Sequence, residues 1–329
     1  MQANPANPNE RLELFSVGKS LNLNGMGTFA DYNKFRFIMK KHGYSGGGIY
    51  RIDKGLSKPD LIFFPKISYS TNLNGGNPDK DLILGDYTFI GDKNLIAKQG
   101  ILVGAGVAAN MRYIYGEGRF LLFNLHSSYD YSFDHQLGVN TFLVNLCSKN
   151  HLRNWSFIDI CLNNENIKRK LSENKTQFVD LNISKIIQLV QNNDTLISTG
   201  LRHLKQRAYN QNLVYFGIDT KFANKKYSDL KVFLGGLKTG NLSEKLSISF
   251  SFSQLLFEKP IKLSLDYKEA IGGQMLNYKR NDKTYGFKIN YIINPNLSFN
   301  LGYNKTNSTI KYFNLSQPIL NIQFSSIKF

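Results

Sequence analysis

The sequence predicts an all-β fold: a transmembrane antiparallel β-barrel of about fourteen strands, preceded by a short helical segment. Apolar and polar residues alternate with a period of two through most of the chain after about residue 60. The composition fits, with 24 Phe, 18 Tyr and 27 Gly but only 8 Pro in 329 residues. No stretch approaches about 18 consecutive apolar residues, which excludes a transmembrane helix but leaves a barrel or a soluble all-β protein.

The N-terminal part has a different pattern. We predict that residues 1–58 form a periplasmic helical segment and linker, and that residues 59–329 form the barrel. The apolar positions of a first short helix are Leu12, Leu14, Phe15, Val17 and Leu21. Thr28 precedes a second helix that ends at Gly43, a good C′ residue, and Gly46-Gly47-Gly48 forms a flexible link.

The start of the chain and its charge bear on the compartment and the partners. Met1 to Pro8 lacks the basic and apolar regions of a signal peptide, and we expect that a start Met has replaced one. The net charge is +17, with the basic residues mostly in turns and on the polar side of strands. We therefore expect lipopolysaccharide phosphates or an acidic client as partners, and no nucleic acid.

Four consecutive runs near the C-terminus show the alternation most clearly. Their large apolar residues are Leu246, Ile248, Phe250 and Phe252; Ile261, Leu263, Leu265 and Tyr267; Tyr285, Phe287, Ile289 and Tyr291; and Leu297, Phe299, Leu301 and Tyr303. The residues between them are mostly Ser, Gly, Asn and Lys. A lysine facing lipid at the membrane midplane costs about 2–4 kcal/mol. We therefore expect Lys262, Lys268 and Lys288 to face the lumen and the aromatic side to face lipid.

The same pattern, followed through the chain, gives an even number of strands, as single-chain bacterial barrels require. The expected strands are 60–73, 99–116, 118–133, 135–150, 155–167, 175–190, 194–208, 212–223, 228–238, 245–257, 260–270, 283–293, 296–306 and 317–329. Short periplasmic turns are expected at 116–118, 191–194, 258–260 and 294–296, and long loops at 74–98, 168–174, 271–282 and 307–316.

The C-terminal residues resemble the assembly signal of outer-membrane barrels. Phe329 follows Ile327 at a spacing of two, but the preceding apolar residues, Leu320, Ile322 and Phe324, lie on the opposite parity. We therefore expect a bulge or register change near Ser325-Ser326. The barrel assembly machinery is the partner that such a signal implies.

Cys147 and Cys161 are the two cysteines, and they flank a short connection at equal distances from Asn154. They can face each other across a hairpin, and a disulfide between them suits an envelope protein. The alternative is a pair of buried thiols.

Two segments mimic catalytic or cofactor motifs. Gly104 to Ala109 resembles a dinucleotide fingerprint, but it continues into a strand instead of opening a helix. His126, Ser128 and Asp130 supply the residue types of a hydrolase triad, yet one strand does not make such groups converge. No cluster has metal-ligand spacing. We expect no enzyme activity, cofactor or metal.

Two prolines draw attention to the seam between the first and last strands. Pro65 and Pro318 are the prolines that fall within or at the start of a predicted strand. Proline donates no hydrogen bond to a ladder, so the seam is a candidate weak pair that opens laterally, with Tyr69 and Ile322 as positions for a cross-link. An equally good interpretation is that Pro318 marks a strand start and Pro65 a bulge.

The region where the barrel begins is similar to the surface lipoprotein assembly modifier (Slam) family. The resemblance lies in Phe64-Pro-Lys-Ile-Ser-Tyr-Ser-Thr-Asn-Leu-Asn-Gly-Gly76, Tyr87-Thr-Phe-Ile-Gly91 and Ala97-Lys-Gln-Gly100. It implies a non-enzymatic translocator in the outer membrane of a Gram-negative bacterium, with both termini in the periplasm. Its client would be a lipoprotein or related secreted protein. The alternative is a passive, weakly anion-selective channel.

Overall fold

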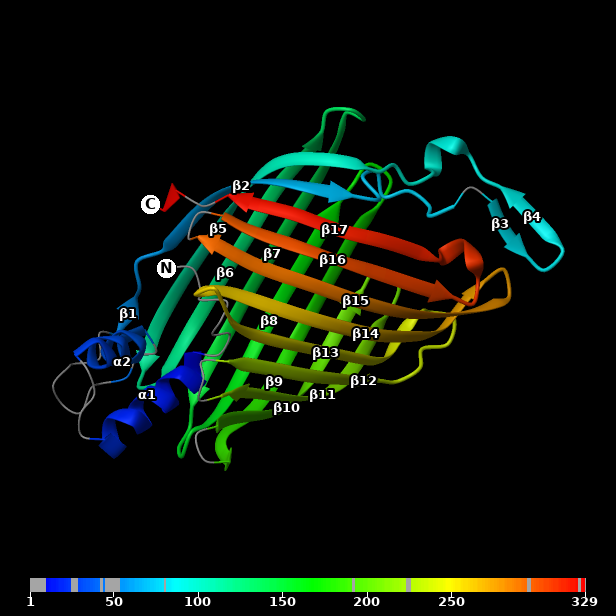
Figure 1. Ribbon diagram of the computed structural model, residues 1–329. Coiled ribbons are helices and arrows are strands. Elements are labelled where there is room, and N and C mark those ends of the chain that lie inside the picture. Colours follow the sequence, from blue (N-terminus) through cyan, green and yellow to red (C-terminus); the bar gives the residue numbers. More distant parts are fainter. Residues whose placement is uncertain are drawn as a thin grey trace.

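The computed structural model describes residues 10–24, 29–41, 44, 54–79, 81–190, 193–222, 226–294, 297–324 and 327–328. It shows a closed antiparallel barrel of fourteen strands with two short helices near the N-terminus (Figure 1). The predicted fold class is confirmed, and each of the fourteen expected strands overlaps one in the wall.

The elements follow one another along the chain with few interruptions. They are α1 (Glu10–Asn24), α2 (Phe29–Lys41), β1 (Gly55–Leu56), β2 (Asp60–Ser70), β3 (Asp81–Leu84), β4 (Tyr87–Ile90), the 3₁₀ turn η1 (Lys93–Leu95), β5 (Gly100–Gly116), β6 (Arg119–Ser132), β7 (Leu137–His151), β8 (Ser156–Lys168), β9 (Glu173–Val190), β10 (Asn193–Gln206), β11 (Asn210–Lys221), β12 (Tyr227–Gly235), β13 (Ser243–Leu256), β14 (Lys259–Met275), β15 (Tyr278–Asn294), β16 (Leu297–Ser308), the 3₁₀ turn η2 (Lys311–Phe313), β17 (Leu315–Phe324) and β18 (Ile327–Lys328).

Each strand from β5 to β16 pairs with the next one along the chain. The first long strand, β2, closes the wall because it pairs with β5 on one side and with β17 on the other. The short β1 also pairs with β5, and β18 pairs with β2 beyond the end of β17. The wall therefore has no free long edge, as a membrane environment demands.

The two faces of the wall have opposite chemistry. Phe250 is 38% exposed, whereas Ser251 and Ser253, on the other parity of the same strand, are 5% and 1% exposed. Exposed Leu, Ile, Val, Phe and Tyr side chains recur on the outward parity of most strands, and buried Ser, Asp and Gln side chains on the inward parity. An apolar exterior around a polar interior is the pattern of a barrel in lipid.

Connection lengths differ between the two ends of the barrel. At one end, the short-turn mouth, the strands are joined by two to five residues: 117–118, 152–155, 191–192, 222–226, 257–258 and 295–296. At the other end, the long-loop mouth, residues 71–99 form the one long connection, which contains the β3–β4 hairpin. This hairpin projects from the barrel (Figure 1).

Two of the expected long loops were wrong: residues 169–172 alone join β8 to β9, and most of 271–282 lies in strands β14 and β15. Gly272 has φ +85° and lies at a register shift in the ladder between β14 and β15, which then continues to a two-residue turn. That turn is Leu276-Asn277, both with positive φ, as a tight hairpin requires. The glycines therefore mark a β-bulge.

The helices lie at the short-turn mouth (Figure 1). Gly18 of α1 approaches Phe35 of α2 closely enough that a Cβ at Gly18 would lie 3.0 Å from the ring. Among the described residues, no helix has the length and apolarity to span a membrane. The proposed linker glycines 46–48 lie outside the described residues.

Candidate functional site: a helix in the short-turn mouth

The helix α1 enters the mouth with its acidic first turn. Glu10 and Glu13 lie there, where negative charge favours the helix dipole. The side chain of Leu12 is 1% exposed and packs against Phe157, Ile186 and Leu196 of the barrel wall. This apolar cluster anchors the helix, since burying one leucine contributes about 1.5–3 kcal/mol.

Two aromatic rings extend this contact. Phe15 packs against Trp155, with ring centroids 4.9 Å apart and nearly perpendicular planes. Trp155 lies in the connection between β7 and β8, at the rim of the short-turn mouth.

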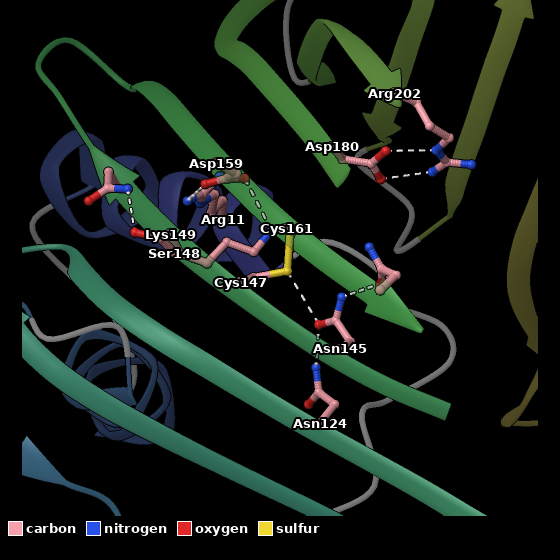
Figure 2. The surroundings of a disulfide bond; sticks show 12 residues. Arg11, Asn124, Asn145, Cys147, Ser148, Lys149, Asp159, Cys161, Asp180 and Arg202 are labelled. Atoms are coloured by element: carbon pink, nitrogen blue, oxygen red, sulfur yellow. Dashed lines mark hydrogen bonds and ion pairs between the residues drawn. A yellow bond between two sulfur atoms is a disulfide. The ribbon is translucent and has the colours of Figure 1, made fainter. Parts of the chain in front are cut away.

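Arg11 forms the first ionic anchor. Its guanidinium donates two hydrogen bonds of 2.8 Å to the carboxylate of Asp159 on β8, and it lies 4.0 Å from the ring centroid of Phe157. Lys149 of β7 also reaches Asp159, at 3.1 Å. Figure 2 shows this group on the lumen face of the β7–β8 hairpin. A bidentate pair of this kind fixes orientation as well as position.

Glu13 forms the second anchor. Its carboxylate is 4% exposed, accepts a hydrogen bond of 2.8 Å from the Tyr227 hydroxyl and pairs with Lys221 at 2.8 Å. Farther along α1, Lys19 lies 3.5 Å from Asp194. A buried carboxylate is tolerated only with such partners, so α1 is held on strands β8 to β12.

Further contacts with the wall at the short-turn mouth come from the first residue of α1, the end of α2 and the residue Tyr44 that follows it. Arg112 of β5 pairs with Glu10 at 3.1 Å and donates to the backbone carbonyl of Lys41 at 3.1 Å. Tyr44 packs edge-on against His151 of β7. Burial raises the pKa of Tyr44 to about 12, so the phenol is neutral at physiological pH.

These contacts fix α1 against strands β8 to β12 at the short-turn mouth, and α1 is called the plug below. The helix is predictable from the sequence but its place is not, because Arg11 and Asp159 are 148 residues apart and nothing local links them. The signal available was a pair of acidic residues in the first turn of an N-terminal helix ahead of a strongly basic barrel.

The predicted disulfide is present. Cys147 and Cys161 are opposite each other on β7 and β8 and are bonded. The next lumen-facing pair of this hairpin is Lys149 and Asp159 (Figure 2). The disulfide therefore fastens the wall next to the anchor of Arg11.

The three predicted lumen lysines lie on the inward parity. Lys262 is opposite the buried Ser253, and Lys268 and Lys288 share its face. Each faces a carboxylate: Lys268 lies 2.8 Å from Glu244, Lys288 lies 3.8 Å from Asp266, and Lys262 interacts with Asp229. Asp266 lies four residues after Lys262 on the same parity, so a carboxylate that offsets part of the lysine charge is visible in the sequence. The side chains of Lys268 and Lys288 are 46% and 49% exposed, so this wall lines open space.

Among the described residues, which leave out 325–326 and 329, the ladder of the seam between β17 and β2 is short. Its pairs run from Leu320 with Tyr69 to Gln323 with Lys66, and β18 adds two more. The expected partner of Tyr69 was wrong, since Ile322 lies opposite Ile67. The neighbouring β16–β17 ladder has ten pairs, so the seam is a short junction in the wall.

Both prolines border this ladder. Pro318 lies in the part of β17 before Leu320, where the strand pairs with β16 alone. Pro65 lies in β2 between the residues that pair with β17 and those that pair with β18. The register changes by one residue there: Gln323 pairs with Lys66, whereas Ile327 pairs with Phe63. This is the change expected near Ser325-Ser326, which themselves, like Phe329, lie outside the described residues.

The residue types of a triad lie on one face but not in triad geometry. Lys66 donates to Ser128 at 3.0 Å and pairs with Asp130 at 2.7 Å, while His126 stacks on Phe64. The glycines of the fingerprint-like segment give these groups room: a Cβ at Gly104 would lie 2.1 Å from Asp130, and one at Gly106 would lie 2.2 Å from the Phe64 ring. Among the described residues, no group of three or more His, Cys, Asp or Glu side chains can hold a metal ion.

Comparison with known proteins gives structural neighbours alone. No family model and no curated protein matches the chain. The chain is similar to OprB from Pseudomonas putida, with 7% identity over 84% of this chain and 95% of that one, and a TM-score of 0.46. It is similar to a BenF-like porin from Pseudomonas fluorescens Pf-5, with 9% identity over 83% and 100%, and a TM-score of 0.41. It is also similar to CdiB from Acinetobacter baumannii, with 10% identity and a TM-score of 0.41, covering 84% of this chain but 61% of that one.

Proposed function

We propose that this chain is an outer-membrane translocator that keeps its short-turn mouth closed with α1 until a client engages it. The observation that carries the proposal is the double anchor of α1, through Arg11 on Asp159 and Glu13 on Tyr227 and Lys221. A barrel that only passes solutes by diffusion gains nothing from a helix fixed in its mouth.

The client is a lipoprotein or related secreted protein, as the Slam resemblance implies. The seam supports this choice, because a wall with a short ladder at one junction offers a lateral exit for a lipid anchor. The β3–β4 hairpin, in the connection after β2, packs Leu82 and Leu84 against Ile310, in the connection before β17.

The setting follows from the same architecture. The apolar exterior supports a setting in the outer membrane of a Gram-negative bacterium, where outer-membrane lipid and lipopolysaccharide would be the partners of the barrel surface. The barrel assembly machinery inserts it. The short turns, α1 and the C-terminal strand face the periplasm, since periplasmic turns are the short ones in such barrels.

The test is co-expression with candidate client proteins, secreted or lipid-anchored, followed by protease digestion of intact cells. The client should reach the surface with the wild-type chain. A client that reaches the surface equally well without this chain refutes the proposal.

A passive channel is the second candidate, and one observation favours it. The wall around Lys268 and Lys288 is open, with paired charges of both signs along it. In planar bilayers the translocator should be quiet, whereas a stable, large conductance from the wild-type chain identifies the channel.

A further inference from the structure

Four asparagines form one row across the lumen wall. Asn110 of β5 pairs with Asn124 of β6, Asn124 with Asn145 of β7, and Asn145 with Asn163 of β8. Neighbouring strands are about 4.8 Å apart, so the four amides follow one another at hydrogen-bonding intervals. On the lumen face of β7 and β8, the pair of Asn145 and Asn163 is next to the disulfide. On the other side of the disulfide is the pair that contains Asp159, the partner of Arg11 (Figure 2).

Three of the amides, those of Asn124, Asn145 and Asn163, are oriented by hydrogen bonds to each other. Asn124 Nδ2 donates to Asn145 Oδ1 at 3.0 Å, and Asn145 Nδ2 donates to Asn163 Oδ1. Each amide has two N–H donors and two acceptor lone pairs, so this chain of bonds leaves donors and acceptors available in equal measure. None of these four side chains has a polar atom that is both buried and without a partner. The remaining groups therefore face accessible space.

That space is a cavity of about 280 Å³ beside the row. Besides the four asparagines it is lined by His126, Glu165 and Phe178. The rings of His126 and Phe64 are stacked, with centroids 5.0 Å apart, which holds the imidazole plane in place. The volume is near the lower end of ligand sites, roughly 300–1,000 Å³, and suits one or two small rings.

Among the residues that line the cavity, the acidic one is Glu165, whose carboxylate can accept hydrogen bonds from hydroxyl groups, and no lysine or arginine is present to bind an anion. The nearest cations are already paired, Lys66 with Asp130 and Arg202 with Asp180, each at 2.7 Å. An anion needs donors and a cation needs acceptors, whereas a hydroxyl group uses both. We propose that this row and cavity bind a neutral oligosaccharide, whose hydroxyls bond the amides and whose C–H faces contact Phe178 and His126. This goes beyond the proposed transport of a protein client.

Isothermal titration calorimetry of the full chain, in a detergent without a sugar headgroup, tests this. The probes are maltotriose, cellotriose, trigalacturonate as the acidic sugar, and tetraglycine as the amide backbone. A neutral trisaccharide should bind in the micromolar to millimolar range, and Asn145→Leu should weaken it at least tenfold. Asn163→Leu serves the same purpose if Asn145→Leu fails to assemble.

The matched control is Asn300→Leu. Asn290 donates to Asn300 in a similar amide pair on β15 and β16, away from the cavity. This variant should bind like the wild type. The proposal is overturned if neither neutral sugar binds, if trigalacturonate or tetraglycine binds more tightly, or if Asn300→Leu weakens binding as much as Asn145→Leu.

Discussion

The hydroxyl of Tyr227 donates a hydrogen bond of 2.8 Å to the carboxylate of Glu13, 214 residues earlier in the chain. This bond joins α1 to the start of β12. The contact of Arg11 with Asp159 joins the same helix to β8, at the other end of the set of strands that α1 touches. Together with the pair between Glu13 and Lys221 at 2.8 Å, the bond from Tyr227 makes the position of the plug depend on one buried carboxylate.

Glu13→Lys should therefore release the plug. Removing one partner from a buried pair costs about 3–5 kcal/mol, and a lysine there adds repulsion from Lys221. We expect wild-type barrels to be quiet in planar bilayers and the variant to conduct. The double variant Glu13→Lys with Lys221→Glu should be quiet again. Lys245→Glu, which alters an exposed pair with Glu269, is the control and should stay quiet. If the wild-type barrel conducts as much as the Glu13→Lys variant, α1 does not close the mouth.

The orientation of the wall predicts opposite outcomes for two adjacent positions. Phe250→Asp places a carboxylate in lipid at an outward position and should prevent assembly. Ser249→Asp places it in the polar lumen, between Lys231 on one neighbouring strand and Asp266 on the other, and should be tolerated. Heat-modifiable migration of outer-membrane fractions measures both. Similar yields of folded barrel from the two variants mean that the assigned faces are reversed.

Locking the seam tests lateral exit. Tyr69→Cys with Leu320→Cys joins the opposite residues of the seam, and oxidation should stop delivery of the client while leaving the barrel folded. The matched control joins Leu301→Cys to Leu320→Cys across β16 and β17, and its oxidation should leave delivery unchanged. Normal delivery through the locked seam means that the client passes along the lumen. Both pairs are introduced with Cys147 and Cys161 in their native disulfide.

The native disulfide should be protected and stabilising. Cys147 and Cys161 should resist alkylation until a reductant is added to unfolded protein, and then both should react. Replacing both by serine should lower the free energy of unfolding by about 2–4 kcal/mol. Quantitative labelling of unreduced protein contradicts the bond.

Tyr44 should make closure of the mouth sensitive to alkali. Its pKa is raised from 10.0 to about 12, so the neutral phenol is favoured in the folded protein. This preference contributes about 2–3 kcal/mol to the free energy of unfolding. The contribution is fully present below pH 10 and is lost as the pH rises through about 12. The ultraviolet difference spectrum between wild type and Tyr44→Phe should show a phenolate that forms only near pH 12. Ionisation of this residue near pH 10 contradicts its burial.

Much of the fold was predictable because strand alternation is local. The parity of Phe250 and the facing of Cys147 and Cys161 follow from a period of two and a short connection. The sequence predicts a loop at Gly272, where the structure has a bulge, because a pair of glycines is typical of both. The site was predictable only in part, since the sequence cannot show which wall strands α1 meets. The partner of Tyr69 was misplaced for a similar reason: the seam joins distant strands, and no turn fixes its register.

The closure of the wall by β2 and β17 also sets an order of events in folding. Tyr69 and Leu320 are about 250 residues apart, so their pairing brings together the ends of a very long chain segment, whereas every other wall junction except that of β2 with β5 is a hairpin. The strands that hold α1, β8 to β12, lie in the middle of the chain and can form a curved sheet before this junction exists. The N-terminal helix can therefore take its place through the open side of an unfinished barrel, and joining the last strand to the first then shuts it in.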